Sequence, residues 1–132
     1  MTAEDMKTLI DELYRLCATD IDRALELYVH DDFVIEEAED LPMAGIYRGK
    51  AALKSLYADV FSMIELAELE RSCFMTGEQC CAYKVVFQLA DPALTPVEVL
   101  EFFRFKDGKV IEIRPYYFSA AAFTRAAART GA

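Results

Sequence analysis

The chain has 132 residues, 55% of them hydrophobic and 28% charged, which is typical of a globular domain spanning residues 1–132 with a real core. Its formal net charge of −9 argues against nucleic acid and against membrane surfaces as partners, because both carry negative charge themselves. No apolar run approaches the roughly 20 residues of a membrane span, and the acidic N-terminus lacks the order of a signal peptide, so we expect a cytoplasmic protein.

Three helices and one strand are predicted in the first half of the chain. Apolar residues recur at helical spacing between residues 4 and 17, and a second helix follows a cap at Thr19 or Asp20. Residues 33–37 are predicted as a strand, and the segment around Pro42, Gly45 and Gly49 is predicted as a loop. A third amphipathic helix is predicted over residues 49–64.

Strands are predicted for most of the second half of the chain. Residues 66–75, 79–90, 97–106 and 109–118 are predicted as strands, and the last two flank Asp107-Gly108, a strong hairpin signal. The alanine-rich tail, residues 120–132, is predicted as a short frayed helix. Helices followed by an antiparallel meander predict an α+β domain whose helices pack on one face of a curved sheet.

The cysteines indicate no metal site. The chain has four cysteines and one histidine, His30, and none of the cysteines shows a ligand spacing such as C-x-x-C. We expect reduced thiols that act as small apolar side chains. We also expect no metal and no cofactor.

Two adjacent glutamates, Glu36 and Glu37, end the first predicted strand. Side chains alternate between the two faces of a strand, so Glu37 shares its face with Phe33 and Ile35, while Glu36 shares the opposite face with Val34. If the face of Phe33 and Ile35 is the buried one, Glu37 is carried into the core. A carboxyl group in an apolar cavity has a raised pKa and is a candidate for proton transfer.

Three passages of the chain carry a family resemblance. Residues 20–32 form a helix that runs into a strand, residues 45–53 enter a helix, and residues 101–110 form a closing hairpin. In this order they resemble the ketosteroid isomerase-like or SnoaL-like superfamily, which has the nuclear transport factor 2-like fold. The resemblance implies a cone-shaped, curved mixed or antiparallel sheet with three helices of the N-terminal half packed on its concave face. It also implies an apolar pocket, and a homodimer joined through the outer sheet face.

The resemblance implies a pair of carboxyl groups in this pocket. The isomerases place their base at the end of the first strand. Counting from Asp20 without gaps reaches Glu36, whereas aligning the following loop reaches Glu37, which strand parity favours. Glu101 falls where the isomerases have an oxyanion aspartate, and it alternates with the apolar Phe103.

The resemblance also implies a shell of tyrosine hydroxyls. Tyr57 falls on a tyrosine of the isomerase hydrogen-bond network, and Tyr28 falls on a position where some isomerases have tyrosine. Tyr14 reaches the position of the oxyanion tyrosine if the turn between the first two helices is shorter; without a gap that position holds Glu12.

Two functions from different classes follow. The first is a small cofactor-independent enzyme of the isomerase, cyclase or dehydratase kind, in which Glu37 is the base and Glu101 the acid or oxyanion donor. The substrate would be a small hydrophobic carbonyl compound. The second is a non-catalytic domain of the same fold that binds a hydrophobic ligand or dimerises. The side chains expected to contact the ligand are Glu36, Phe33, Ile35, Phe61, Phe103, Phe105 and Tyr117.

Overall fold

Four helices and a six-stranded sheet make up residues 1–130, which are the part of the chain that the computed structural model describes. Residues 131–132, the last two of the predicted domain and of its predicted terminal helix, lie outside the described residues. The helices are α1 (Ala3–Thr19), α2 (Ile21–Tyr28), α3 (Lys50–Met63) and α4 (Ala120–Thr130). The strands are β1 (Val29–Glu37), β2 (Gly45–Arg48), β3 (Leu66–Gly77), β4 (Cys80–Leu89), β5 (Val97–Lys106) and β6 (Lys109–Tyr117).

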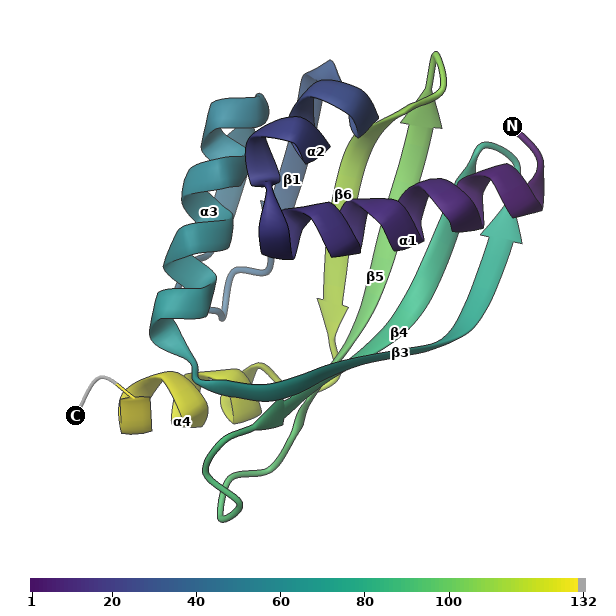
Figure 1. Ribbon diagram of the computed structural model, residues 1–132. Helices are drawn as coiled ribbons and strands as arrows, with labels where there is room; N and C mark the ends of the chain where they lie inside the picture. The colour runs from purple at the N-terminus through teal and green to yellow at the C-terminus, as the bar shows by residue number, and fades with distance from the viewer. Residues whose placement is uncertain (131–132) are drawn as a thin grey trace.

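The sheet is mixed and curved, with the strand order β2-β1-β6-β5-β4-β3. β1 runs parallel to β6, and the other neighbouring strands are antiparallel. Helices α1, α2 and α3 lie on the concave face, so that α1 crosses the sheet and α3 stands beside it (Figure 1). The predicted α+β class, with three helices on one face of a curved sheet, is confirmed.

Helix α1 is fixed across the sheet by its N-terminal cap and by one apolar stripe. Thr2 Oγ1 accepts a hydrogen bond from the backbone N–H of Asp5, and Asp5 Oδ2 accepts one from the N–H of Thr2, each at 3.0 Å. The side of α1 that faces the sheet is apolar and buried, through Met6, Leu9, Ile10, Leu13 and Leu16. The cap and the stripe together fix the rotation of α1, and so determine which of its other side chains point toward the concave face of the sheet.

Strand β2 corrects the prediction of a loop around residue 45. Gly45 and Gly49 do have positive φ angles of 138° and 89°, but they bracket a short edge strand rather than an irregular segment. Gly45 pairs with Glu37 in β1, and the backbone N–H of Gly49 donates to the carbonyl of Phe33 at 2.8 Å. This pairing holds the end of β1, where Glu37 lies, in a fixed register.

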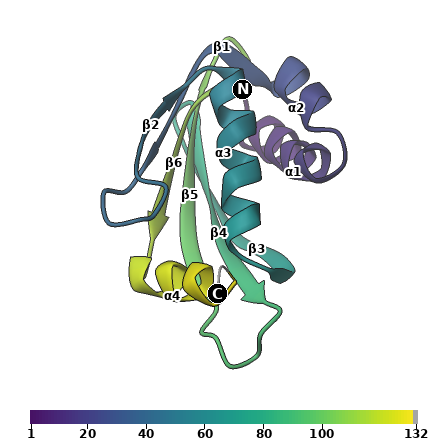
Figure 2. The same cartoon turned by 90° about the vertical axis from the view of Figure 1, so that its left-hand side faces the viewer.

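Helix α4 corrects the prediction of a frayed tail. Phe123 is fully buried, and Ala122 and Ala126 are buried beside it. The ring of Phe123 meets that of Tyr117 edge-on, with 5.7 Å between centroids. Helix α4 lies beneath the C-terminal end of α3 and covers that end of the sheet (Figure 2).

The outer sheet face combines exposed apolar side chains with ion pairs. Leu100 is 39% exposed and Tyr116 53% exposed. Arg104 Nε lies 3.1 Å from Glu112 Oε1 on the same face. The predicted homodimer through this face stays a prediction. Within the described residues, no helix is long and apolar enough to cross a membrane.

Candidate active site

A cavity of about 870 Å³ lies between α1, α3 and the concave face of the sheet. That volume lies within the range of roughly 300–1,000 Å³ that is usual for sites that bind small molecules. Most of the wall is apolar, and includes Leu13, Leu56, Val60, Phe61, Phe87 and Phe103. A few polar side chains also reach the wall, among them Tyr14, Glu37, Tyr57, Arg71, Glu101 and Tyr117. That this cavity is the predicted apolar ligand pocket stays a prediction.

Glu37 lies at the end of β1 and points into this cavity. It is 5% exposed, and its Oε1 atom is buried without a hydrogen-bond partner in the described part of the chain. Burial, and in second place the charge of Glu101, raise the pKa of Glu37 from 4.5 to about 8. The inward orientation predicted from strand parity is confirmed.

Glu36 lies on the opposite face of β1 and does not line the cavity. Its Oε1 atom is 2.9 Å from Nη2 of Arg114 on the outer face of the sheet. The expectation that Glu36 contacts a ligand is therefore wrong. The reason is the alternation of side chains along a strand, which sends the neighbour of an inward residue outward.

Glu101 is the second carboxyl group of the cavity. It lies on β5, and β6 separates β5 from β1, so the two glutamates face the cavity from either side of one strand. The hydroxyl of Tyr14 donates to Glu101 Oε1 at 2.8 Å. Burial raises the pKa of Glu101 to about 6, against the hydrogen bond from Tyr14 and the positive charge of Arg71, which both lower it. Glu101 is thus better stabilised as an anion than Glu37.

Tyr14 occupies its place on α1 because aromatic rings hold it from two sides. Its ring meets those of Tyr83 and Phe103 edge-on, at centroid distances of 6.3 and 6.2 Å. Burial, followed by the charge of Glu101, raises the pKa of Tyr14 well above its usual value, so the phenol stays a proton donor. Glu12, the alternative at this position, instead pairs with Arg15.

Two further tyrosines line the cavity with hydroxyls that make no hydrogen bond to another described residue. Tyr57, on α3, packs its ring 4.7 Å from that of Phe61. Tyr117 lies at the end of β6, and burial followed by the charge of Glu37 raises the pKa of its hydroxyl. Tyr28 does not line the cavity, which corrects the expectation. It ends α2, where the chain turns into β1, and it packs against the core.

Four of the six predicted apolar contacts line the cavity: Ile35, Phe61, Phe103 and Tyr117. Phe33 and Phe105 do not, which corrects the expectation for both. They are 1% and 4% exposed, within the core. Phe105 pairs with Val110, which pairs with Val29 at the start of β1, so Phe105 lies at the end of the sheet where α2 runs into β1. Both rings pack into the hydrophobic core instead of the cavity wall.

Arg71 is a cavity residue that the sequence analysis missed. It lies on β3 and shares a face with Leu69, which also lines the cavity. That two-residue spacing was a usable signal, but Arg71 precedes a bulge between Ser72 and Met75 where Cys73 has a positive φ of 56°. If the alternation of side chains is counted back from the C-terminal end of β3, it therefore places Arg71 on the outer face of the sheet, away from the cavity.

No metal centre is indicated in residues 1–130, where no three side chains of histidine, cysteine, aspartate or glutamate are grouped as a metal ion would require. The four cysteines are free thiols. One of them, Cys17, lines the cavity, and burial raises the pKa of its thiol to about 11. The cavity wall also carries the carboxyl groups of Glu37 and Glu101 and the hydroxyls of Tyr14, Tyr57 and Tyr117.

Removing the hydroxyl of Tyr14 should raise the pKa of Glu101 and lower the stability of the protein. In the Tyr14→Phe variant the Glu101 carboxylate loses the hydrogen bond that Tyr14 donates, which should cost about 1 kcal/mol at pH 7. The pKa is measured by NMR of ¹³C-labelled glutamate carboxyls, and stability by urea denaturation. The matched control is Tyr57→Phe, because the hydroxyl of Tyr57 makes no hydrogen bond within the described part of the chain. An unchanged pKa of Glu101 in Tyr14→Phe would contradict this role.

The sequence itself matches no protein-family model and no curated protein. Solved structures do match. An NTF2-like protein from Burkholderia xenovorans LB400 is 18% identical with a TM-score of 0.75, and the match covers 96% of this chain and 98% of that one. A candidate SnoaL-like polyketide cyclase from Mesorhizobium loti is 24% identical with a TM-score of 0.68, covering 89% and 100%.

The chain therefore has the NTF2-like fold that the sequence resemblance implied. A third match limits what the fold alone can say about function. A de novo designed protein with a curved β-sheet is 12% identical, with a TM-score of 0.74 and coverage of 99% and 98%. Since a designed sheet and natural NTF2-like proteins share this shape, function has to be argued from the side chains in the cavity.

Proposed function

We propose that the cavity is the active site of a small cofactor-independent enzyme that moves a proton next to the carbonyl group of a hydrophobic substrate. The isomerase, cyclase and dehydratase reactions share this step. The observation that carries the proposal is that Glu37 and Glu101 both line one apolar cavity but have different surroundings. Glu101 has a hydroxyl donor and Arg71 near it, whereas Oε1 of Glu37 has no partner among the described residues.

These surroundings assign different protonation states to the two groups. With pKa values of about 8 for Glu37 and about 6 for Glu101, the pair carries one proton near pH 7, and that proton resides on Glu37. Glu101 is then the base and Glu37 the acid. This assignment reverses the roles expected from the resemblance. Carboxyl groups whose pKa values are pushed apart are a recurring arrangement in acid–base enzymes.

The proton transfers can be followed atom by atom. The carboxylate of Glu101 takes a proton from the carbon next to the substrate carbonyl, and the C–H electron pair moves toward the carbonyl oxygen. The protonated carboxyl of Glu37 donates a hydrogen bond to that oxygen as its negative charge develops. Glu101 then returns the proton to the same carbon, which gives exchange, or to the γ-carbon when a conjugated double bond extends the enolate, which gives isomerisation; Glu37 keeps its own proton. Tyr14 holds Glu101 in position, while Tyr57 and Tyr117 offer hydroxyls to the substrate.

The inward orientation of the two carboxyls favours this proposal over a binding domain without catalysis. Two solvated carboxyls, or a pocket filled by aromatic side chains, would have favoured simple binding. Instead Glu37 and Glu101 both line an open cavity. The likeness to a candidate polyketide cyclase supports the same class of chemistry, because such a ring closure also needs an acid or a base in an apolar pocket.

The rate of proton transfer should follow a bell-shaped pH profile with a maximum near pH 7. The rate should rise as Glu101 ionises near pH 6 and fall as Glu37 loses its proton near pH 8. The measurement is the exchange of α-hydrogens of apolar ketones and enones into D₂O, followed by ¹H NMR. The control is the double variant Glu37→Gln/Glu101→Gln. Exchange no faster than with this control across the panel would contradict the proposed function.

A further inference from the structure

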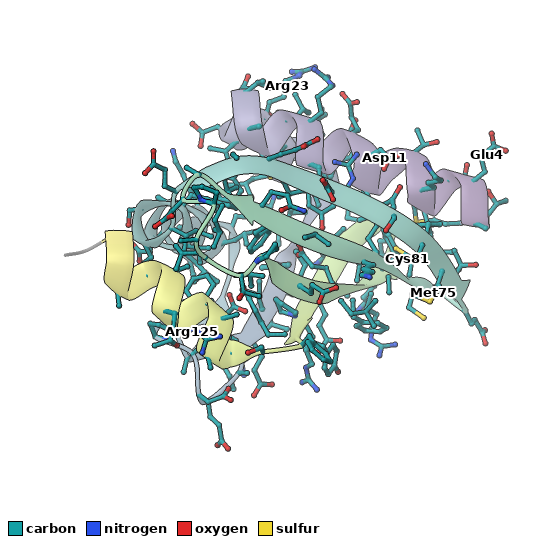
Figure 3. All side chains as sticks on the ribbon, turned by 90° about the horizontal axis from the view of Figure 1, so that it is seen from below. Glu4, Asp11, Arg23, Met75, Cys81 and Arg125 are labelled. Carbon is teal, nitrogen blue, oxygen red and sulfur yellow. The ribbon has the colours of Figure 1, made fainter. Side chains whose placement is uncertain are left out.

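A group of charged side chains lies at the α1 and β3 side of the cavity. Asp11, which lies on α1 (Figure 3), receives three contacts. Tyr83 Oη donates to Asp11 Oδ1 at 2.6 Å, Lys7 Nζ lies 2.9 Å from Oδ2, and Arg71 Nη2 lies 3.4 Å from Oδ1. Asp11 and Arg71 both line the cavity. With one acid and two bases, this group carries a net positive charge in a chain whose net charge is −9.

The guanidinium group of Arg71 is held in place but keeps most of its donors free. Its central carbon lies 4.6 Å from the ring centroid of Tyr14 and 5.6 Å from that of Tyr83, so two aromatic rings fix its position. A guanidinium has five N–H groups. Among the described residues, Asp11 is the one polar partner of Arg71. The two carboxylate oxygens of Asp11 already accept hydrogen bonds from Tyr83 and Lys7, so Asp11 engages the guanidinium of Arg71 only in part.

The other cation on the cavity wall is already paired. Arg15 contacts both carboxylate oxygens of Glu12, one turn away on α1. Arg71 is therefore the cation of the described cavity wall whose donors are available to a ligand. It is also close to the proposed chemistry, because the ring it stacks on belongs to Tyr14, whose hydroxyl reaches Glu101.

We propose that Arg71 binds an anionic group, in particular a carboxylate, at the edge of this cavity. The ligand is then amphiphilic, with its apolar part against the cavity wall and its carboxylate at the guanidinium of Arg71. A planar guanidinium can donate two parallel hydrogen bonds to the two oxygens of one carboxylate. An anion placed deeper in the cavity would instead meet the charge of Glu101 without a cation of its own. This inference deepens the proposed function by naming the substrate class, and it rests on that function in taking the same cavity as the site.

The test compares decanoate with decan-1-ol, which share an apolar chain and differ in the charge of the head group. Binding of each is measured by isothermal titration calorimetry at pH 7.5 with wild type, Arg71→Met and Arg15→Met. We expect Arg71→Met to weaken decanoate binding about tenfold or more while the affinity for decan-1-ol stays nearly unchanged. The matched control is Arg15→Met, because Arg15 is engaged by Glu12; it should preserve the preference for decanoate.

Two results would overturn the inference. The first is an unchanged preference for decanoate in Arg71→Met, whether or not both affinities fall equally. The second is a loss of preference in Arg15→Met as large as that in Arg71→Met. If Arg71→Met does not fold, as judged by circular dichroism, Arg71→Gln replaces it with the same expectations. The α-hydrogen exchange assay separates the two proposals. Decanoate preference without exchange contradicts only the enzyme function, and exchange without preference contradicts only the role of Arg71.

Discussion

Replacing Glu37 with glutamine should stabilise the protein at alkaline pH by on the order of 4 kcal/mol, because glutamine cannot ionise inside the cavity. Glu37 is 5% exposed, and burial raises its pKa from 4.5 to about 8. In the unfolded chain the same carboxyl would ionise near its ordinary value. Between these two pH values the folded protein holds a proton that the unfolded chain has released.

The free energy of unfolding of the wild type should decrease with rising pH because of Glu37. The contribution of neutral Glu37 to the free energy of unfolding is fully present below about pH 4.5. It decreases as the pH rises and is lost above about pH 8. Wild type and Glu37→Gln should therefore have similar stability at pH 4 and differ most at pH 9, as measured by urea denaturation at several pH values.

The control for this measurement is the neighbouring residue. Glu36→Gln removes an exposed carboxyl that pairs with Arg114 on the outer face, and it should change stability by less than about 1 kcal/mol at any pH. Parallel stability curves for wild type and Glu37→Gln would show that Glu37 ionises at its ordinary pKa, and would remove the acid from the proposed mechanism.

Glu101→Gln should reduce the rate of α-hydrogen exchange by roughly 10²–10⁴-fold, the usual contribution of a general base. The amide cannot accept the substrate proton, whatever the pH. Glu37→Gln should reduce the rate of α-hydrogen exchange less than Glu101→Gln does, because the N–H of the glutamine amide still donates a hydrogen bond to the carbonyl oxygen of the substrate. The measurement is kcat/KM in the D₂O exchange assay at pH 7.

The pH profiles of the two variants separate the possible roles. Glu37→Gln should lose the alkaline limb near pH 8 and keep the acidic limb, which belongs to Glu101. The opposite pattern, with Glu37→Gln inactive and Glu101→Gln active, would make Glu37 the base. That pattern would restore the roles that the resemblance to the isomerases implied.

The sequence predicted best what depends on local periodicity. The two-residue repeat of a strand was enough to place Glu37 inside, and the same repeat on β5 placed Glu101 with Phe103. The hairpin at Asp107-Gly108 followed from turn chemistry, and both residues do have positive φ angles. These features need no knowledge of how the helices sit on the sheet.

The predictions that failed depend on packing between distant elements. Phe33 and Phe105 share the inward faces of their strands with the cavity residues Ile35 and Phe103, but their rings are enclosed in the hydrophobic core. Tyr28 was misplaced because its position at the end of α2 depends on the turn into β1. Arg71 was missed because the bulge that follows it changes the parity of β3.

The protonation order of the two glutamates could not be predicted from sequence either. Both are glutamates near apolar residues, and the difference between them comes from the hydroxyl of Tyr14 on α1 and the positive charge of Arg71 on β3, which both lower the pKa of Glu101. A hydrogen bond and a nearby cation lower the pKa of Glu101, whereas Oε1 of Glu37 has no hydrogen-bond partner among the described residues, so Glu37 keeps the proton. Only the packing of α1 on the sheet determines the contact between Tyr14 and Glu101.

An NMR titration of the glutamate side-chain carboxyls in ¹³C-labelled protein tests the protonation order of Glu37 and Glu101 directly, with Glu37→Gln and Glu101→Gln used to assign the signals. We expect Glu101 to titrate near pH 6 and Glu37 near pH 8, so that one proton remains on the two carboxyls at neutral pH. Two signals that both titrate below pH 5 would contradict this expectation.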